Sequence, residues 1–307
     1  EKNLIVFPFA FDSEMQSGGV KTNKLETYLK NAVVSVASAK HYNPDDCVIF
    51  ATNMGRDVLP SWFVDLMEQY KIIIDHIPFD QFIFNNEIKW GLAFYKLCVF
   101  AHYLETTNCK SISYMDVDVY VQSDFTNIWR ECSRNVLVYD IGHGLQVPNY
   151  KSFVTELTEF CGQTLYTQYG GEFVAASREN GRLLLEEMYC VYDEMKRREF
   201  VTEKGDEFIL CVSANRYLKK YGTLKNAAAY VCRNWTSWDF HLVSTNYRYN
   251  AVVVLHLPAE KQKGLLKIFN RYVVKLRIPN REKVWHICRL SKQPFRDRVR
   301  YTVNTWK

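Results

Sequence analysis

The first 115 residues alternate short apolar runs with helical segments, and this alternation leaves few folds open to the chain. The apolar runs lack polar alternation, and they are Asn3–Phe11, Cys47–Ala51 and Lys71–Ile77. Apolar residues recur every three to four positions in Lys24–Lys40, and we expect two more helices at Trp62–Tyr70 and Lys89–Leu104. Apolar strands that alternate with helices form a mostly parallel sheet, which helices cover on both faces. We therefore expect an α/β fold with a Rossmann-like sheet.

The next apolar run, Ser111–Val121, carries two acidic residues, Asp116 and Asp118. We expect one continuous strand, in which alternate residues share a face and the two carboxylates point the same way. Converging carboxylates favour a hard divalent cation such as Mg²⁺ or Mn²⁺, which can also bind the phosphates of a substrate. Ligands of such sheets bind at the carboxyl ends of the strands. The alternative interpretation is a strand that runs into an acidic turn.

The composition and charge of the chain limit the kind of protein that it can be. With 48% hydrophobic and 24% charged residues, the chain is a folded globular protein rather than an extensively disordered one. The net charge is +5, but lysine and arginine are concentrated after residue 260, and the preceding part is net acidic. We expect residues 265–307 to form a helical, basic and aromatic extension.

The nine cysteines are scattered, without a C-x-x-C pair and with an odd total. This pattern argues against a zinc site or a disulfide framework and favours a reducing compartment. No apolar run reaches the length of a membrane span. We therefore expect a cytoplasmic protein.

Three later motifs follow the Asp-Val-Asp segment in order: Gly170-Gly171-Glu172, Asp206-Glu207 and His256. Together with Lys96–Val121, they resemble the motifs of nucleotide-sugar-dependent glycosyltransferases of the GT-A fold. The resemblance is strongest to the retaining family of glycogenin and the bacterial lipo-oligosaccharide galactosyltransferases. This chain lacks that family's asparagine before the glycine, has Glu207 in place of its glutamine, and only approximates its G-x-x-K-P-W motif at residues 259–264.

The resemblance implies a catalytic domain over residues 1–264 and a role for each motif. Asp116, Asp118 and His256 would bind Mn²⁺ or Mg²⁺, and Asp206 and Glu207 would act in catalysis. The donor, a UDP- or GDP-sugar, would contact residues near the strand ends, the glycine pair and the lysines. We expect these donor-binding residues to be Phe9, Ala10, Phe11, Asp12, Asn53, Asp75, Lys96, Val117, Gly170, Gly171, Lys261 and Lys263.

Several alternatives stay open. Asp206 or Glu207 would be the general base if the enzyme inverts the sugar's configuration, whereas the resemblance favours retention. A catalytically inactive, glycan-binding relative or a non-enzymatic metal- or membrane-binding protein would keep some of these features. A sugar-phosphate nucleotidyltransferase would need a G-x-G-T-R loop after the first strand, and Phe9–Asp12 does not supply one.

The basic C-terminal segment has three interpretations: a solvated helix, a nucleic-acid-binding segment or a membrane-surface anchor. No nucleic-acid recognition module accompanies it, so we expect no nucleic-acid partner. Apolar residues such as Val284, Trp285 and Phe295 lie among arginines and lysines, which favours peripheral contact with the cytoplasmic face of a membrane. A glycan or a lipid-linked acceptor is the expected second substrate.

Overall fold

The structure is a computed structural model of the chain. It describes residues 1–12, 24–84, 88, 90–141, 148–162, 167–234 and 249–290. The basic residues beyond 290 lie outside these ranges.

The main sheet of the described residues has seven strands in the order β3-β2-β1-β4-β7-β6-β8. Neighbouring strands from β3 to β4 are parallel, and so are β6 and β8, whereas β7 is antiparallel to both β4 and β6. The expected α/β fold with a mostly parallel sheet is therefore confirmed. The strands are β1 (Leu4–Phe9), β2 (Cys47–Thr52), β3 (Ile73–His76), β4 (Ser111–Met115), β6 (Val136–Asp140), β7 (Tyr169–Ser177) and β8 (Leu224–Asn226).

A second sheet of three short strands lies beside the main sheet, again within the described residues. In it, β10 is antiparallel to β5 and parallel to β9. Its strands are β5 (Val119–Val121), β9 (Val231–Arg233) and β10 (Val254–His256).

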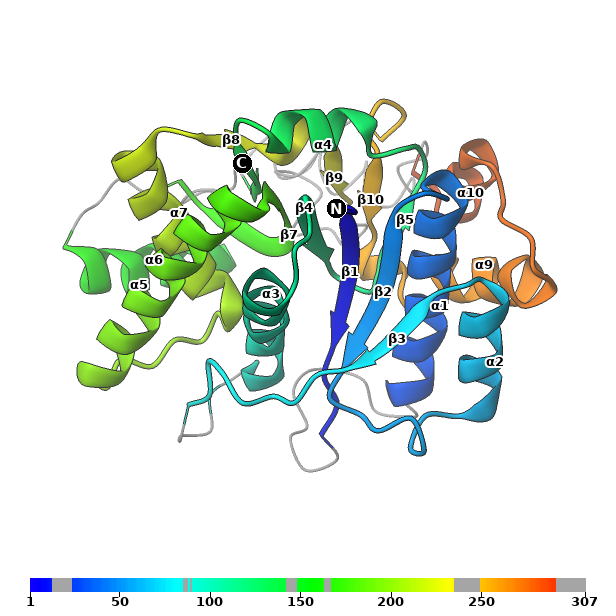
Figure 1. Ribbon diagram of the computed structural model, residues 1–307, viewed down its shortest axis with the longest axis horizontal. Helices are drawn as coiled ribbons and strands as arrows, with labels where there is room; N and C mark the ends of the chain where they lie inside the picture. The colour runs from blue at the N-terminus through cyan, green and yellow to red at the C-terminus, as the bar shows by residue number, and fades with distance from the viewer. Residues whose placement is uncertain are drawn as a thin grey trace, which may run out of the picture.

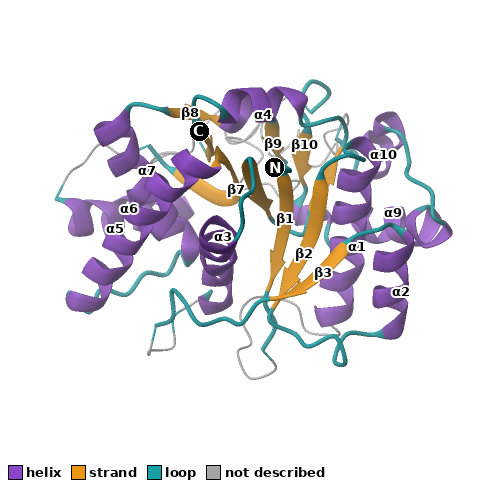
Figure 2. Ribbon diagram, viewed as in Figure 1, coloured by secondary structure: helices purple, strands orange, loops and turns teal. Residues whose placement is uncertain are grey.

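Helices lie on both sides of the strands (Figure 2). Figure 1 shows α5, α6 and α7 towards one end of the molecule and α1, α2, α9 and α10 towards the other. The helices are α1 (Lys24–Tyr42), α2 (Ser61–Gln69), α3 (Tyr95–Thr106), α4 (Thr126–Cys132), α5 (Pro148–Cys161), α6 (Arg178–Arg197), α7 (Asp206–Tyr221), α9 (Gly264–Arg271) and α10 (Arg281–Ile287). The 3₁₀ turns are η1 (Gly91–Phe94), η3 (Ala227–Ala229), η4 (Pro258–Glu260) and η5 (Val273–Lys275). None of the helices in these ranges has both the length and the apolar character that a membrane span requires.

The described part of the predicted C-terminal extension packs onto the rest of the molecule. Tyr120 in β5 donates a hydrogen bond from its hydroxyl to the carbonyl oxygen of Pro279. The indole N–H of Trp285 donates to Gln122 Oε1 at 2.9 Å. The apolar residues that this segment buries in the common core are Leu265, Ile268, Phe269, Val273 and Val284.

The expectation of one continuous strand over Ser111–Val121 is wrong. β4 ends at Met115 and β5 begins at Val119, and the two strands belong to different sheets. The acidic residues therefore lie in the turn that carries the chain from one sheet to the other. The local alternative, a strand that runs into an acidic turn, describes the backbone correctly.

Candidate active site

The turn between β4 and β5 is held by a buried serine of the first helix. Ser35 in α1 is fully buried, and its hydroxyl oxygen lies 2.8 Å from the carbonyl oxygens of both Val117 and Val119. The same oxygen accepts a hydrogen bond from the Val119 N–H at 3.2 Å. Because this turn leaves the regular hydrogen bonding of both sheets, a side chain must satisfy its backbone groups. Ser35 thereby fixes the backbone on both sides of Asp118.

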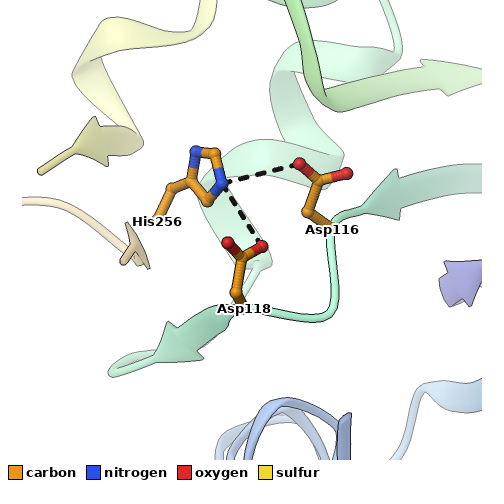
Figure 3. A group of neighbouring side chains, drawn as sticks. All are labelled: Asp116, Asp118 and His256. Carbon is orange, nitrogen blue, oxygen red and sulfur yellow. Dashed lines mark ion pairs between the residues drawn. The ribbon is translucent and has the colours of Figure 1, made fainter. Parts of the chain in front are cut away.

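The pairing of β5 with β10 brings His256 to this turn. His256 is opposite Val119 in the antiparallel register, and the Leu257 N–H donates to the Asp118 carbonyl oxygen at 2.9 Å. His256 Nε2 lies 3.4 Å from Asp118 Oδ1 and 3.5 Å from Asp116 Oδ2 (Figure 3). Residues far apart in the sequence therefore form one cluster at the carboxyl end of β4.

The donor set of this cluster fits a divalent cation. Each of Asp116, Asp118 and His256 offers one ligand atom, and these atoms lie within 4.8 Å of one another. Two carboxylates and one imidazole suit Mn²⁺ or Mg²⁺, whose remaining coordination positions can take phosphate oxygens. Asp118 and His256 are almost fully buried, whereas the Asp116 side chain is 28% exposed.

Two lysines neutralise the paired aspartates. Lys261, at the end of η4, places Nζ 3.0 Å from Asp118 Oδ2 and lies over the Tyr28 ring. Lys96 in α3 places Nζ 2.9 Å from Asp116 Oδ1. Burial alone would raise the pKa of the Asp118 carboxyl, but Lys261 and His256 hold it well below its usual range.

Lys96 also reaches the Asp206-Glu207 pair at the start of α7. Its Nζ lies 2.9 Å from Asp206 Oδ2 and donates to the Gly171 carbonyl oxygen at 3.0 Å. A Cβ added at Gly171 would lie 2.4 Å from Asp206 Oδ2 and 3.3 Å from Lys96 Nζ. Glycine at position 171 therefore leaves the space in which this ion pair forms. Lys96 and Gly171, both expected to bind the donor, therefore lie together beside Asp206.

Asp206 and Glu207 have raised pKa values. Burial raises the pKa of Asp206 to about 6, against the opposing effect of Lys96. Burial raises the pKa of Glu207 to about 7, against Arg233 and with the help of Glu172. Two adjacent carboxyl groups with pKa values near neutrality can exchange protons at physiological pH, which is the property that acid–base catalysis requires.

Comparison with solved structures finds glycosyltransferases whose fold is similar to that of this chain. The galactosyltransferase LgtC, solved with donor and acceptor sugar analogues, aligns over 92% of this chain and 99% of its own, with a TM-score of 0.56 and 14% identity. Mouse xyloside xylosyltransferase 1 aligns over 85% of this chain and 98% of its own, with a TM-score of 0.51 and 11% identity. The bifunctional glycosyltransferase WbbM aligns over 84% of this chain and 45% of its own, with a TM-score of 0.55 and 8% identity.

The chain has the GT-A fold. No family model matches its sequence, and no curated protein is similar to it in sequence. The likeness therefore lies in the three-dimensional arrangement. Within the GT-A fold, the Asp116–Asp118–His256 cluster lies at the carboxyl edge of the parallel strands, where the sequence predicted it.

Several of the expected donor-binding residues lie at the carboxyl ends of β1, β2 and β3. The Asn53 side chain bonds the Phe11 main chain through both its oxygen and its nitrogen, at 2.9 and 3.1 Å. Asp75 accepts a hydrogen bond from the Tyr103 hydroxyl at 2.7 Å. Phe9 packs against Tyr28, with ring centroids 5.7 Å apart. Asn53 and Asp75 therefore shape this edge of the sheet through contacts within the chain.

The remaining predicted donor residues differ in their placement. Val117 is buried in the turn itself, and Ala10 follows β1. Asp12 and Lys263 are exposed. Of the two lysines after His256, Lys261 contacts Asp118. Lys263 is exposed, and its backbone N–H donates a hydrogen bond to the Glu260 carbonyl oxygen.

Sequence reasoning gave no role to two charged residues of the site, Glu172 and Arg233. Glu172 Oε1 lies 3.7 Å from His256 Nδ1 and 3.5 Å from Arg233 Nε. Burial alone would raise the pKa of Glu172, but Arg233 and His256 lower it to about 2. Burial alone would lower the pKa of His256, but Asp118 and Glu172 raise it to about 9. An acidic residue inside an otherwise apolar strand was the available signal for Glu172, and Arg233 had none.

Proposed function

We propose that the protein is a metal-dependent glycosyltransferase, which moves a sugar from a UDP- or GDP-sugar to a glycan or lipid-linked acceptor. The observation that carries the proposal is the Asp116–Asp118–His256 cluster at the carboxyl edge of a GT-A sheet. The names of the similar structures support sugar transfer as the reaction. The acidic residues around the site outnumber the lysines and arginine beside them, which favours a divalent cation. The acidic residues are Asp116, Asp118, Glu172, Asp206 and Glu207, and the basic residues are Lys96, Lys261 and Arg233.

In this proposal, Asp116, Asp118 and His256 would hold Mn²⁺ or Mg²⁺. When bound, the ion supplies Lewis-acid stabilisation of the charge that grows on the departing nucleoside diphosphate. Lys261 carries three N–H donors and contacts Asp118 with one of them. We expect the others to bind phosphate oxygens, since the lysine is a compact positive charge beside the ion site.

Asp206 and Glu207 are proposed to face the reacting sugar. Lys96 holds the Asp206 carboxylate in place from one side, and the free N–H groups at the start of α7 stabilise its negative charge. An ionised Asp206 would stabilise the oxocarbenium-like transition state of the sugar. Glu207, with a pKa of about 7, would hold or release a proton at the acceptor hydroxyl.

The resemblance to the retaining family supports retention of the sugar's anomeric configuration, with inversion as the alternative. In the inverting alternative, Asp206 or Glu207 would remove the proton of the attacking hydroxyl directly. Proton NMR of the first product, recorded before the anomers equilibrate, distinguishes the two. An inverted anomeric centre would reject retention and assign the base role.

The proposed activity is tested by a screen of UDP- and GDP-sugars for Mn²⁺-dependent donor hydrolysis and transfer. We expect Asp118→Asn to lower the rate by about 100-fold or more, because the site loses one charged ligand. The matched control is Asp65→Asn on the exposed face of α2, which should leave the rate unchanged. Absence of turnover with every donor would favour the inactive, glycan-binding alternative, and an unaffected Asp118→Asn variant would reject the metal role.

Contact with a membrane surface and a cytoplasmic location remain proposals from the sequence. In the described residues, Arg281, Lys283 and Arg289 are exposed on and after α10. Val284 is buried, and Trp285 hydrogen-bonds Gln122, so these two apolar residues face the protein. Flotation with anionic and neutral liposomes tests the contact, and equal partitioning in both would reject it.

A further inference from the structure

Glu172 is a buried carboxylate to which the proposed chemistry gives no role. It lies in β7 and is 3% exposed. Its Oε1 atom faces two groups, Nδ1 of His256 at 3.7 Å and Nε of Arg233 at 3.5 Å. A carboxylate is costly to bury without a partner, so its location between these groups calls for a specific explanation.

The two nitrogens of His256 face different partners. Nε2 faces the carboxylates of Asp116 and Asp118, while Nδ1 faces Glu172. An imidazole that binds a cation through one nitrogen carries its proton on the other, and the partner of that N–H fixes the ring's tautomer and orientation. We propose that Glu172 is a positioning residue, which holds the Nδ1–H of His256 so that Nε2 presents its lone pair to the divalent ion. This inference rests on the metal site of the proposed function.

Arg233 supports this geometry from the neighbouring strand. It is the register partner of His256 in the parallel pairing of β9 and β10, so both residues reach the same face at the same level. Its guanidinium compensates the charge of Glu172. The carboxylate therefore stays a hydrogen-bond acceptor, which is the role that an Nδ1–H donor requires.

Gly170, two residues before Glu172, makes room for the carboxylate. A Cβ added at Gly170 would lie 1.9 Å from Glu172 Oε2, so no larger residue fits while Glu172 keeps its place. The backbone of Glu172 acts on the site as well, because its carbonyl oxygen accepts a hydrogen bond from the Asp116 N–H at 3.1 Å. Glu172 thus contacts two of the three candidate ligands, one through its side chain and one through its main chain.

The test measures Mn²⁺ binding without turnover, from the electron paramagnetic resonance signal of free Mn²⁺ during titration. We expect Glu172→Gln to weaken Mn²⁺ binding by about 10–100-fold, the usual effect of removing an outer-shell partner. The matched control is Glu187→Gln, which changes a buried glutamate of α6 that pairs with Lys220, and it should bind Mn²⁺ as the wild type does.

A double variant separates positioning from general loss of structure. In a His256→Ala background, Glu172→Gln should cause no further loss of Mn²⁺ affinity, since the side chain it positions is gone. An equal loss in both backgrounds would overturn the inference, as would wild-type affinity in Glu172→Gln alone. A wild-type protein that does not bind Mn²⁺ would instead overturn the metal site of the proposed function, and the inference with it.

Discussion

At the scale of single residues, Glu207 holds a charge that its surroundings disfavour. Its pKa of about 7 in the folded protein, raised by burial and by Glu172 against Arg233, exceeds the ordinary value of 4.5. The folded state therefore binds this proton more tightly than the unfolded state does. Stability falls as the pH rises through 4.5 to 7, and the full cost is present above that range.

We predict that Glu207→Gln stabilises the protein at pH 8 by about 3 kcal/mol in unfolding free energy, because the neutral amide removes this cost. The gain should vanish near pH 4, where both states are protonated. Urea unfolding at the two pH values measures it. A gain of equal size at both would show that the charge of Glu207 is not its cause. Greater stability of the variant at pH 8 would indicate that the Glu207 carboxylate is kept for function rather than for stability.

The site residues that could be predicted are those that belong to short motifs and follow one another along the chain in a known order. Asp116, Asp118 and His256 follow that rule, and they lie together as expected. Glu172 and Arg233 could not be predicted as partners, because β7 lies in the main sheet and β9 and β10 lie in the second sheet. Only the packing of the two sheets brings Glu172 to Arg233 and His256. A side chain that acts by positioning another residue belongs to no motif with a fixed spacing, so the sequence gives no sign of its role.

At the scale of elements, the break between β4 and β5 was invisible because both halves are apolar and buried. An argument from alternating side chains assumes one continuous strand, but the buried Val117 fits the same alternation although it lies in the turn. After β4 ends, the backbone of the turn is held by a residue distant in the sequence. The hydroxyl of Ser35 in α1 hydrogen-bonds the Val117 carbonyl oxygen and the Val119 N–H. Helix and turn therefore form one unit that sets the direction of the acidic side chains.

We predict that Ser35→Ala lowers the unfolding free energy by about 1–3 kcal/mol, because it leaves buried backbone groups without a partner. It should also weaken Mn²⁺ binding, since the turn that carries the aspartates loosens. Ser38→Ala is the matched control: Ser38 is also buried on α1, but it accepts a hydrogen bond from Val121, away from the aspartates. Ser38→Ala should lower stability alone. Equal Mn²⁺ affinity in the two variants would contradict the link between Ser35 and the site.

At the scale of the whole molecule, the alternation of strands and helices in the first half predicted the parallel part of the sheet. The second half was harder to predict because β8, β9 and β10 are only three residues each. Strands this short have no readable period, and their places depend on partners distant in the sequence. The basic charge after residue 264 likewise concealed apolar side chains that this segment buries, such as Leu265 and Val284.

These buried side chains predict that the chain cut after residue 264 does not fold as the full chain does. Full burial of an apolar side chain contributes about 1.5–3 kcal/mol, and this segment buries Leu265, Ile268, Phe269, Val273 and Val284. Their sum is comparable to the whole stability of a domain, about 5–15 kcal/mol. Urea unfolding of the truncated and full chains measures the difference, and an unchanged midpoint and cooperativity would show that the segment is separable.

A pair of point variants separates the effect of lost packing from the effect of removing the whole segment. Phe269 is 5% exposed and its ring meets Trp62 edge-on, with centroids 5.7 Å apart, so Phe269→Ala should cost about 3–5 kcal/mol. Leu276, in the same segment, is 52% exposed, and Leu276→Ala should change stability by less than about 0.5 kcal/mol. Because α9 packs on the helix that carries Ser35, the Phe269 variant should also weaken Mn²⁺ binding, which would tie the C-terminal helices to the site.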